Sequence, residues 1–209
     1  MSNKKSLAFV AVLATIPAAH AGITYNIEKA NVVFNTGQTS NLTVTETGNK
    51  LDFTAGSLPL AVGDGAYTGG GRSNAEITIL YTVNSTVPIA NLGLTFSGST
   101  INQGGLTYTE YVESIDGSKT LGSVSGSYFG AGLGGSNTPF TPTDNIHFST
   151  PVNSYKVKKS FSLMDFDSNP AASYAALGYI EQNAQPVPEP LPAGVLGLGI
   201  VGLVLRRRK

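Results

Sequence analysis

The 209-residue sequence contains no cysteine and no tryptophan, and only 12% of its residues are charged. The lack of cysteine excludes disulfide bonds, metal-thiolate sites and cysteine nucleophiles. A zinc site is excluded as well, because His147 is the one histidine beyond the N-terminal segment and zinc prefers nitrogen and sulfur ligands. We therefore expect no cofactor, and a fold held together by apolar burial and strand pairing alone.

Basic residues are also scarce in the body of the chain. The formal charge of the whole sequence is zero, but between Gly22 and Gln185 seven Lys and Arg residues stand against twelve Asp and Glu residues, a net charge of −5. Nucleic acid is excluded as a partner, because binding to phosphates requires a basic surface. The same charge disfavours docking on anionic lipid.

The N-terminus has the three parts of a secretory signal peptide. The apolar stretch is too short to span a bilayer and is followed by Pro17, which disfavours the alternative of an N-terminal membrane anchor. We predict cleavage after Ala21, so that residues 1–21 are removed. The three parts are a basic start at Lys4 and Lys5, an apolar run over 7–16, and the small-x-small site Ala19-His20-Ala21.

The C-terminus combines a Pro/Glu motif, an uncharged apolar run and a basic end. The fifteen-residue run would span roughly 22 Å as a helix, less than the roughly 30 Å hydrocarbon core, and four glycines weaken it further. The basic end should stay on the cytoplasmic side, which places the preceding domain outside. In order, the tail consists of Val187-Pro188-Glu189-Pro190, residues 191–205, and Arg206-Arg207-Arg208-Lys209.

This tail resembles the sorting signal of PEP-CTERM proteins. The resemblance covers residues 187–209 and implies that an exosortase recognises and cuts the tail, with the inner membrane holding residues 191–205 only transiently. It implies a precursor anchored in the inner membrane and a product at the cell surface or outside the cell. An ordinary tail anchor is the alternative, disfavoured because Pro188-Glu189-Pro190 lies directly before the span.

Residues 22–186 are predicted to form a single all-β domain, an antiparallel β-sandwich or jelly roll. The segments 74–83 and 155–163 alternate apolar and polar residues with a period of two, which indicates strands with one buried face. Thr47-Gly48-Asn49 predicts a tight hairpin, and the glycine-rich segments 63–71 and 122–135 are interpreted as long exposed loops. Further short strands are predicted at 23–34, 41–47, 50–55, 89–96, 106–113, 146–150 and 172–180.

Residues for catalysis are few, and we predict that the domain is not an enzyme. His147 stands between two apolar residues of a strand, so it should face solvent. The segment 122–126 has valine where a serine-hydrolase elbow has its nucleophile. Glu110 and Glu113 could form the carboxylate pair of a glycosidase, but their odd spacing places them on opposite faces of a strand.

A calcium site is a weaker possibility. Asp165, Asp167 and Asn169 have the alternate spacing that opens a calcium-binding loop. The rest of the loop fails, since Pro170 replaces the required glycine and Ala176 the bidentate glutamate. An acidic turn without a metal is the alternative.

Three functions remain open after these exclusions. The first is a structural or adhesive component of the cell surface, extracellular matrix or biofilm. It is suggested by the targeting signals and by the lack of a recognisable set of catalytic residues. The second is a carbohydrate-binding module for exopolysaccharide. The third is an enzyme with an unrecognised carboxylate pair. Sugar binding would use an aromatic platform, for which the candidates are Tyr108, Tyr111, Tyr128 and Phe129, although tyrosines of β proteins commonly pack across strands.

Overall fold

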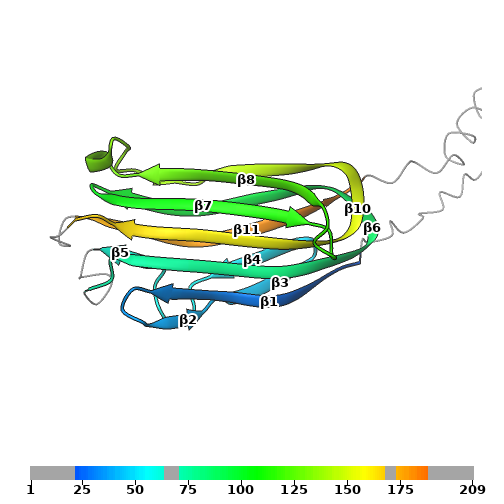
Figure 1. Ribbon diagram of the computed structural model, residues 1–209, viewed down its shortest axis with the longest axis horizontal. Helices are drawn as coiled ribbons and strands as arrows, with labels where there is room; N and C mark the ends of the chain where they lie inside the picture. The colour runs from blue at the N-terminus through cyan, green and yellow to red at the C-terminus, as the bar shows by residue number, and fades with distance from the viewer. Residues whose placement is uncertain (1–21, 64–70, 168–172, 188–209) are drawn as a thin grey trace, which may run out of the picture.

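The computed structural model describes residues 22–63, 71–167 and 173–187, and these form an antiparallel all-β structure (Figure 1). The predicted signal peptide 1–21 and the tail beyond Val187 lie outside the described residues. Within the described residues, no helix is long and apolar enough to cross a membrane. The elements are β1 (Ile23–Phe34), β2 (Thr39–Asn41), β3 (Thr43–Thr47), β4 (Lys50–Thr54), β5 (Ala61–Gly63), β6 (Asn74–Ile101), β7 (Gly104–Glu113), β8 (Thr120–Phe129), the 3₁₀ turn η1 (Ala131–Leu133), β9 (Pro139–Phe140), β10 (Thr143–Asp165) and β11 (Tyr174–Pro186).

Two long strands organise the fold. β6 and β10 pair with each other from Asn74↔Met164 to Thr95↔Thr143. The ladder is irregular between His147 and Ser154, where both strands double back at one end of the molecule (Figure 1). Pro88 and Pro151 lie at this bend, and a proline cannot donate a hydrogen bond to a ladder.

The prediction of short separate strands is therefore wrong at two places. The segments 74–83 and 89–96 belong to one strand, β6, and the segments 146–150 and 155–163 belong to β10. The prolines bend the paired strands without ending the pairing, which resumes at Ser154↔Asn84.

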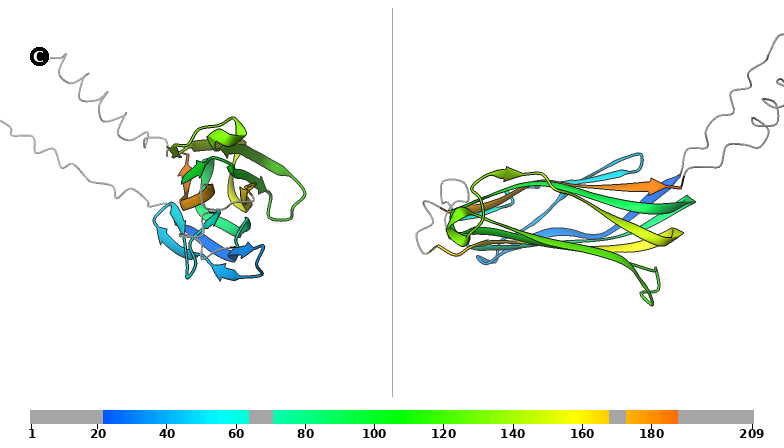
Figure 2. Two further views of the ribbon diagram at one scale, coloured as in Figure 1. Left: turned by 90° about the vertical axis from the view of Figure 1, so that its left-hand side faces the viewer. Right: turned by 90° about the horizontal axis from the view of Figure 1, so that it is seen from above.

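Doubling back of β6 and β10 produces two facing layers, so the predicted antiparallel sandwich is observed (Figure 2). The first layer contains β2, β1, the first half of β6, the second half of β10, β7 and β8. The second contains β3, β4, β11, the second half of β6 and the first half of β10. β5 and β9 pair with β11 and β6.

The space between the layers is filled by apolar side chains, and Phe96 is a central one. Its ring lies 4.7 Å from that of Tyr108 and 5.2 Å from that of Phe161, both from the opposite layer, with edge-to-face geometry. Truncating a buried aromatic ring of this kind costs about 3 to 5 kcal/mol. Aromatic rings from both layers therefore pack against one another in the core.

The predicted hairpin at 47–49 is confirmed, since Thr47 pairs with Lys50 and Gly48 has a φ of 63°. The interpretation of 122–135 as an exposed loop is wrong for its first part, because residues up to Phe129 belong to β8. Gly126 faces Tyr108 so closely that a Cβ there would lie 2.6 Å from the ring. The glycine is therefore needed here because a side chain would collide with the Tyr108 ring, and not because the segment is a flexible loop. In the other predicted loop, residues 64–70 lie outside the described residues.

The described chain enters and leaves the sandwich at the same end. The Gly22 carbonyl accepts a hydrogen bond from Thr86 N, and Val187 N donates to the Pro88 carbonyl, so both residues flank the bend of β6. Figure 1 shows this end on the right, with β5 and η1 at the opposite end.

Candidate functional site

The outer surface of the first layer carries a patch of hydroxyl groups around one exposed ring. The patch lies on the adjacent strands β6, β10 and β7, where Lys158 of β10 is paired with Leu80 of β6 and with Tyr111 of β7. Two residues further along β10, Ser160 is paired in the same way with Thr78 and Thr109. These side chains face outward because their neighbours in the sequence face the core. We call this patch the Tyr111 face; it consists of Thr78, Leu80, Thr109, Tyr111, Lys158 and Ser160.

Tyr111 is 44% exposed, one of the few large apolar side chains so exposed among the described residues. The threonine and serine neighbours are too short to cover its ring, and beside it they leave a depression of about 400 Å³. The strands fix the positions of these groups, which makes the patch more rigid than a loop would be.

The charge on the Tyr111 face is balanced. Lys158 Nζ lies 2.8 Å from Glu113 Oε1, and the Lys158 side chain is 52% exposed. On the same surface Lys156 pairs with Glu28 at 3.1 Å. Because each of these two ammonium groups has a carboxylate partner, neither adds an unpaired positive charge to the hydroxyl groups and the aromatic ring of the face.

A second group of rings lies at the end of the sandwich far from Gly22 and Val187. Tyr128 stacks on Phe140 with ring centroids 4.1 Å apart and on Tyr108 with centroids 6.4 Å apart. Tyr108 donates a hydrogen bond to the Asp144 carboxylate. Burial, followed by the effect of Asp144, raises the pKa of both tyrosines, which therefore stay neutral at physiological pH. The Tyr128 ring is thus partly buried against other rings.

Beside Tyr128 and Phe140 lies a depression of about 390 Å³. Its rim is the segment after β8, which Asn137 holds by accepting hydrogen bonds from Asn102 N at 2.7 Å and Ala131 N at 2.8 Å. Thr100 lines it, and the Thr100 hydroxyl has no hydrogen-bond partner in the part of the chain that the structure describes. This depression offers ring edges and hydroxyl groups but no open ring face.

The four rings proposed from the sequence as one platform do not come together. Tyr108 and Tyr128 point into the sandwich, whereas Tyr111 points out of it. The Phe129 ring lies against the backbone of Gly105, where a Cβ would be 3.0 Å from it. Of these four residues, Tyr111 is the one with a ring that is largely exposed on the outer face of the sheet.

The two glutamates of β7 lie on opposite faces, as their spacing predicts. Glu110 is 1% exposed and faces the core, whereas Glu113 pairs with Lys158 on the outside. They therefore cannot act on one substrate from the two sides of a glycosidic bond.

His147 faces solvent, also as predicted. Its neighbours Ile146 and Phe148 are buried, and His147 Nδ1 lies 2.6 Å from Asn91 Oδ1 on the adjacent strand.

The predicted calcium ligands lie at the end of β10. The Asp165 carboxylate accepts hydrogen bonds from the Ser173 hydroxyl at 2.7 Å and from Asp167 N at 3.1 Å, so it already closes a turn. Asn169 lies outside the described residues. Within residues 22–63, 71–167 and 173–187, no three carboxylate or histidine side chains gather as metal ligands would. The calcium site stays a prediction.

The sequence reasoning missed a buried polar cluster. Lys159, Glu110 and Gln182 are at most 2% exposed and meet between the layers. The signal was present, because in the alternation of 155–163 Lys159 occupies the apolar face together with Val157 and Phe161.

Of the predicted sorting motif, the structure describes Val187 alone. Pro188, Glu189, Pro190, the run 191–205 and the basic end 206–209 lie outside the described residues, as do the cleavage-site residues Ala19 and Ala21.

Searches against protein-family models and curated proteins found no match. Among solved structures, the carbohydrate-binding module TmCBM61, in complex with β-1,4-galactotriose, is 14% identical, with a TM-score of 0.31 over 78% of this chain and 89% of that one. The xylan-binding module CBM15 is 12% identical, with a TM-score of 0.31 over 79% of this chain and 100% of that one. The active domain of tailspike protein 4 of bacteriophage CBA120 is 9% identical, with a TM-score of 0.35 over 79% of this chain, which spans only 19% of that one. The likeness is loose in every case, so what this domain binds has to be judged from its own surface.

Proposed function

We propose that the β-sandwich is a non-catalytic, exported domain that binds polysaccharide through the Tyr111 face. The observation that carries this proposal is the exposed Tyr111 ring next to a depression lined by Thr78, Thr109 and Ser160. A sugar ring has an apolar face of C–H groups, which packs on an aromatic ring, and hydroxyl groups at its edge, which pair with threonine and serine.

The expected ligand is an uncharged polysaccharide. Lys158, the charged side chain whose head lies on this face, is held by Glu113 at 2.8 Å. The net charge of −5 over residues 22–185 also opposes the approach of an acidic polymer.

The position of the termini supports delivery by the tail. Gly22 and Val187 lie together at the bend of β6, so a tail that begins at Val187 leaves the sandwich from one end. The Tyr111 face runs along the side of the sandwich and stays accessible whether the tail is membrane-held or cut. In this proposal an exosortase cuts the tail and the domain then acts as an adhesive component of the exopolysaccharide matrix.

Affinity gel electrophoresis tests the binding function. We expect neutral polysaccharides such as xylan or β-1,4-galactan to retard the purified protein, and Tyr111→Ala to weaken the retardation. Tyr179→Ala is the matched control, because Tyr179 is also exposed, at 36%, but lies on β11 in the other layer. Equal retardation of the wild-type and Tyr111→Ala proteins, or no retardation by any neutral or acidic polysaccharide, would refute this function.

Delivery is tested separately by deleting residues 187–209. We expect the truncated protein to be missing from the cell surface and from the matrix, as judged by fractionation and immunoblotting. Mass spectrometry of the C-terminus of the surface form should show that Arg206 to Lys209 have been removed. Unchanged delivery of the truncated protein would contradict the sorting proposal and leave the binding proposal intact.

A further inference from the structure

A lysine, a glutamine and a glutamate meet at the centre of the sandwich. Lys159 lies on β10 and Glu110 on the paired strand β7, with Lys159 Nζ 2.7 Å from Glu110 Oε2. Gln182 comes from β11 in the opposite layer, and Lys159 Nζ contacts its Oε1. The three side chains are at most 2% exposed. An amine, an amide and a carboxyl group are therefore enclosed together away from water.

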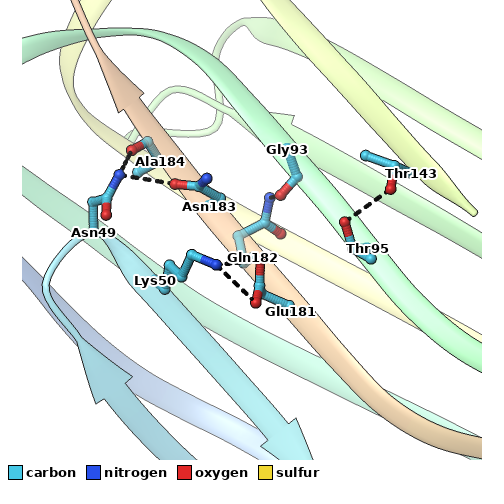
Figure 3. A network of polar contacts seen from close by, with 9 residues as sticks. All are labelled: Asn49, Lys50, Gly93, Thr95, Thr143, Glu181, Gln182, Asn183 and Ala184. Atoms are coloured by element: carbon cyan, nitrogen blue, oxygen red, sulfur yellow. Dashed lines mark hydrogen bonds and ion pairs between the residues drawn. The ribbon is translucent and has the colours of Figure 1, made fainter. Parts of the chain in front are cut away.

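The amide of Gln182 is held in a fixed orientation. Its Nε2 donates to the Gly93 carbonyl at 2.7 Å, as Figure 3 shows, and its Oε1 accepts from the Tyr81 hydroxyl at 3.1 Å. Burial, followed by the Glu110 charge, raises the pKa of Tyr81, so this phenol remains a donor. The carbonyl group of Gln182 is thus held next to Lys159 Nζ, with its oxygen hydrogen-bonded to Tyr81 as well.

Burial disfavours the charged form of the amine. It lowers the pKa of Lys159, although the Glu110 carboxylate acts in the opposite direction. Apart from the ion pair with Lys159, neither oxygen of Glu110 has a hydrogen-bond partner among the described residues. Transfer of one proton from the ammonium to this carboxylate removes two buried charges and leaves a free amine, which is the nucleophilic form.

We propose that Lys159 and Gln182 form an intramolecular isopeptide bond that joins the two layers, with Glu110 as the proton shuttle. Lys159 Nζ attacks Cδ of Gln182, and the electron pair of the carbonyl moves to Oε1, where the Tyr81 hydroxyl stabilises it. Glu110, which already holds the proton taken from the ammonium, gives it to the leaving nitrogen Nε2 and then, as a carboxylate again, accepts the proton that Nζ loses. The Cδ–Nε2 bond then breaks, the carbonyl re-forms and ammonia leaves, so the reaction needs no oxidant or other reactant.

Such a bond would take the place of a disulfide in this chain, which contains no cysteine. It would connect the second half of β10 to β11, which lie in opposite layers, and would close a loop in the unfolded chain. The inference is independent of the proposed polysaccharide binding, because the Tyr111 face lies on the other side of the same strands.

The link can be detected in the full chain by digestion under denaturing conditions. Trypsin cuts after Lys158 but cannot cut after an acylated Lys159, and an endoprotease specific for glutamate cuts after Glu181. We expect a joined pair of peptides, one running from Lys159 to Glu181 and the other beginning at Gln182, with a combined mass lower by one ammonia. Fragmentation should place the junction at the two side chains.

Two variants serve as matched controls. Glu110→Gln keeps the size of the side chain but cannot shuttle the proton, and Lys159→Arg keeps the positive charge but removes the primary amine. We expect only unlinked peptides from both variants. A circular-dichroism spectrum of a folded protein would show that the link is missing because the reacting group is changed, and not because the variant is unfolded.

Separate peptides from the wild-type chain, with cleavage after Lys159, would overturn the proposal. A loss of water that joins Lys159 to the Glu110 peptide would overturn the choice of Gln182. An undiminished link in Glu110→Gln would overturn the role of Glu110.

Discussion

Lys158 and Lys159 are neighbours on β10, and each makes an ion pair with a glutamate of β7. Lys158 Nζ lies 2.8 Å from Glu113, with its side chain 52% exposed, whereas Lys159 Nζ lies 2.7 Å from Glu110, with its side chain fully buried. The outer pair belongs to an open, hydroxyl-rich surface suited to a ligand. The inner pair is enclosed with Gln182 and Tyr81, where every contact comes from the protein itself.

The difference shows that the side of the sheet, rather than the chemical group, decides what an ion pair does here. In water both ions are screened and solvated, and the outer pair contributes little to stability. Between the layers the ions have lost their hydration, so each depends on its partner. The same ammonium and carboxylate are therefore a surface feature at one position and a reactive, structurally critical group at the next.

The largest effect should come from breaking the inner pair. Glu110→Ala leaves Lys159 buried without its carboxyl partner and also removes the proton shuttle of the proposed link, and we expect the free energy of unfolding to fall by about 3 to 5 kcal/mol. Urea unfolding followed by circular dichroism measures this change. A loss as small as that of a surface substitution would mean that the two environments do not differ as described.

Replacing both members of the inner pair should be milder than removing one. In Glu110→Leu/Lys159→Met both charges are gone and the volume is largely kept, and such exchanges are often close to neutral. We expect the double variant to unfold nearer to the wild-type protein than Glu110→Ala does, in the same urea experiment. A double variant less stable than Glu110→Ala would contradict the view that an unpaired buried charge is the main cost.

High pH should destabilise the inner side of the sandwich. Burial, followed by the charge of Glu46, raises the pKa of Tyr25 to about 12 from 10.0, and burial also raises the pKa of Tyr81 and Tyr155. Because the folded-state pKa values are raised, this stability is fully present below pH 10.0, the unfolded value, and is lost as the pH rises through the folded value. We expect the urea midpoint to decrease above about pH 10. A urea midpoint that stays unchanged from about pH 9 to about pH 12 would contradict this.

Tyr111→Ala should change binding and leave stability almost unaltered. We expect the affinity for a neutral polysaccharide to fall at least about tenfold, equivalent to about 1.4 kcal/mol. Stability should stay within about 0.5 kcal/mol, because the ring is a surface group. Isothermal titration calorimetry and urea unfolding measure the two quantities. A large loss of stability would show that the ring belongs to the core after all.

The smallest effect is expected for the outer pair. Glu113→Ala should lower the free energy of unfolding by about 0 to 1 kcal/mol, and less at high salt, because the pair is solvent-exposed. Comparison with Glu110→Ala in the same urea series gives the contrast between the two faces directly. Equal decreases in the free energy of unfolding for the two variants would show that the two ion pairs do not differ in their contribution to stability.

Much of the fold could be predicted from residue patterns. Alternation in 74–83 and 155–163 predicted strands with a buried face. The odd spacing of Glu110 and Glu113 placed them on opposite sides of the strand predicted at 106–113. Thr47-Gly48-Asn49 predicted its hairpin, because a tight turn requires a residue that accepts positive φ. These features depend on neighbours close in the sequence.

Other features could not be predicted in this way. The segments 74–83 and 89–96 were predicted as separate strands, as were 146–150 and 155–163. Each pair forms one strand that bends near Pro88 or Pro151 and continues, since its partner bends at the same level. Residues 122–129 were interpreted as loop for their glycines, yet Gly126 provides the space that the Tyr108 ring occupies. In both cases the reason lies in a strand distant in the sequence.

The sequence by itself determined the all-β class, the acidic and cysteine-free character of the body, and which side chains share a face of each strand, because alternation and composition are local properties. The tertiary structure alone decided that Tyr111 is left open while Tyr128 is covered, and that Lys159, Glu110 and Gln182 meet. Those contacts depend on how two layers face each other, and burial between layers is what changes the chemistry of a side chain from one residue to the next.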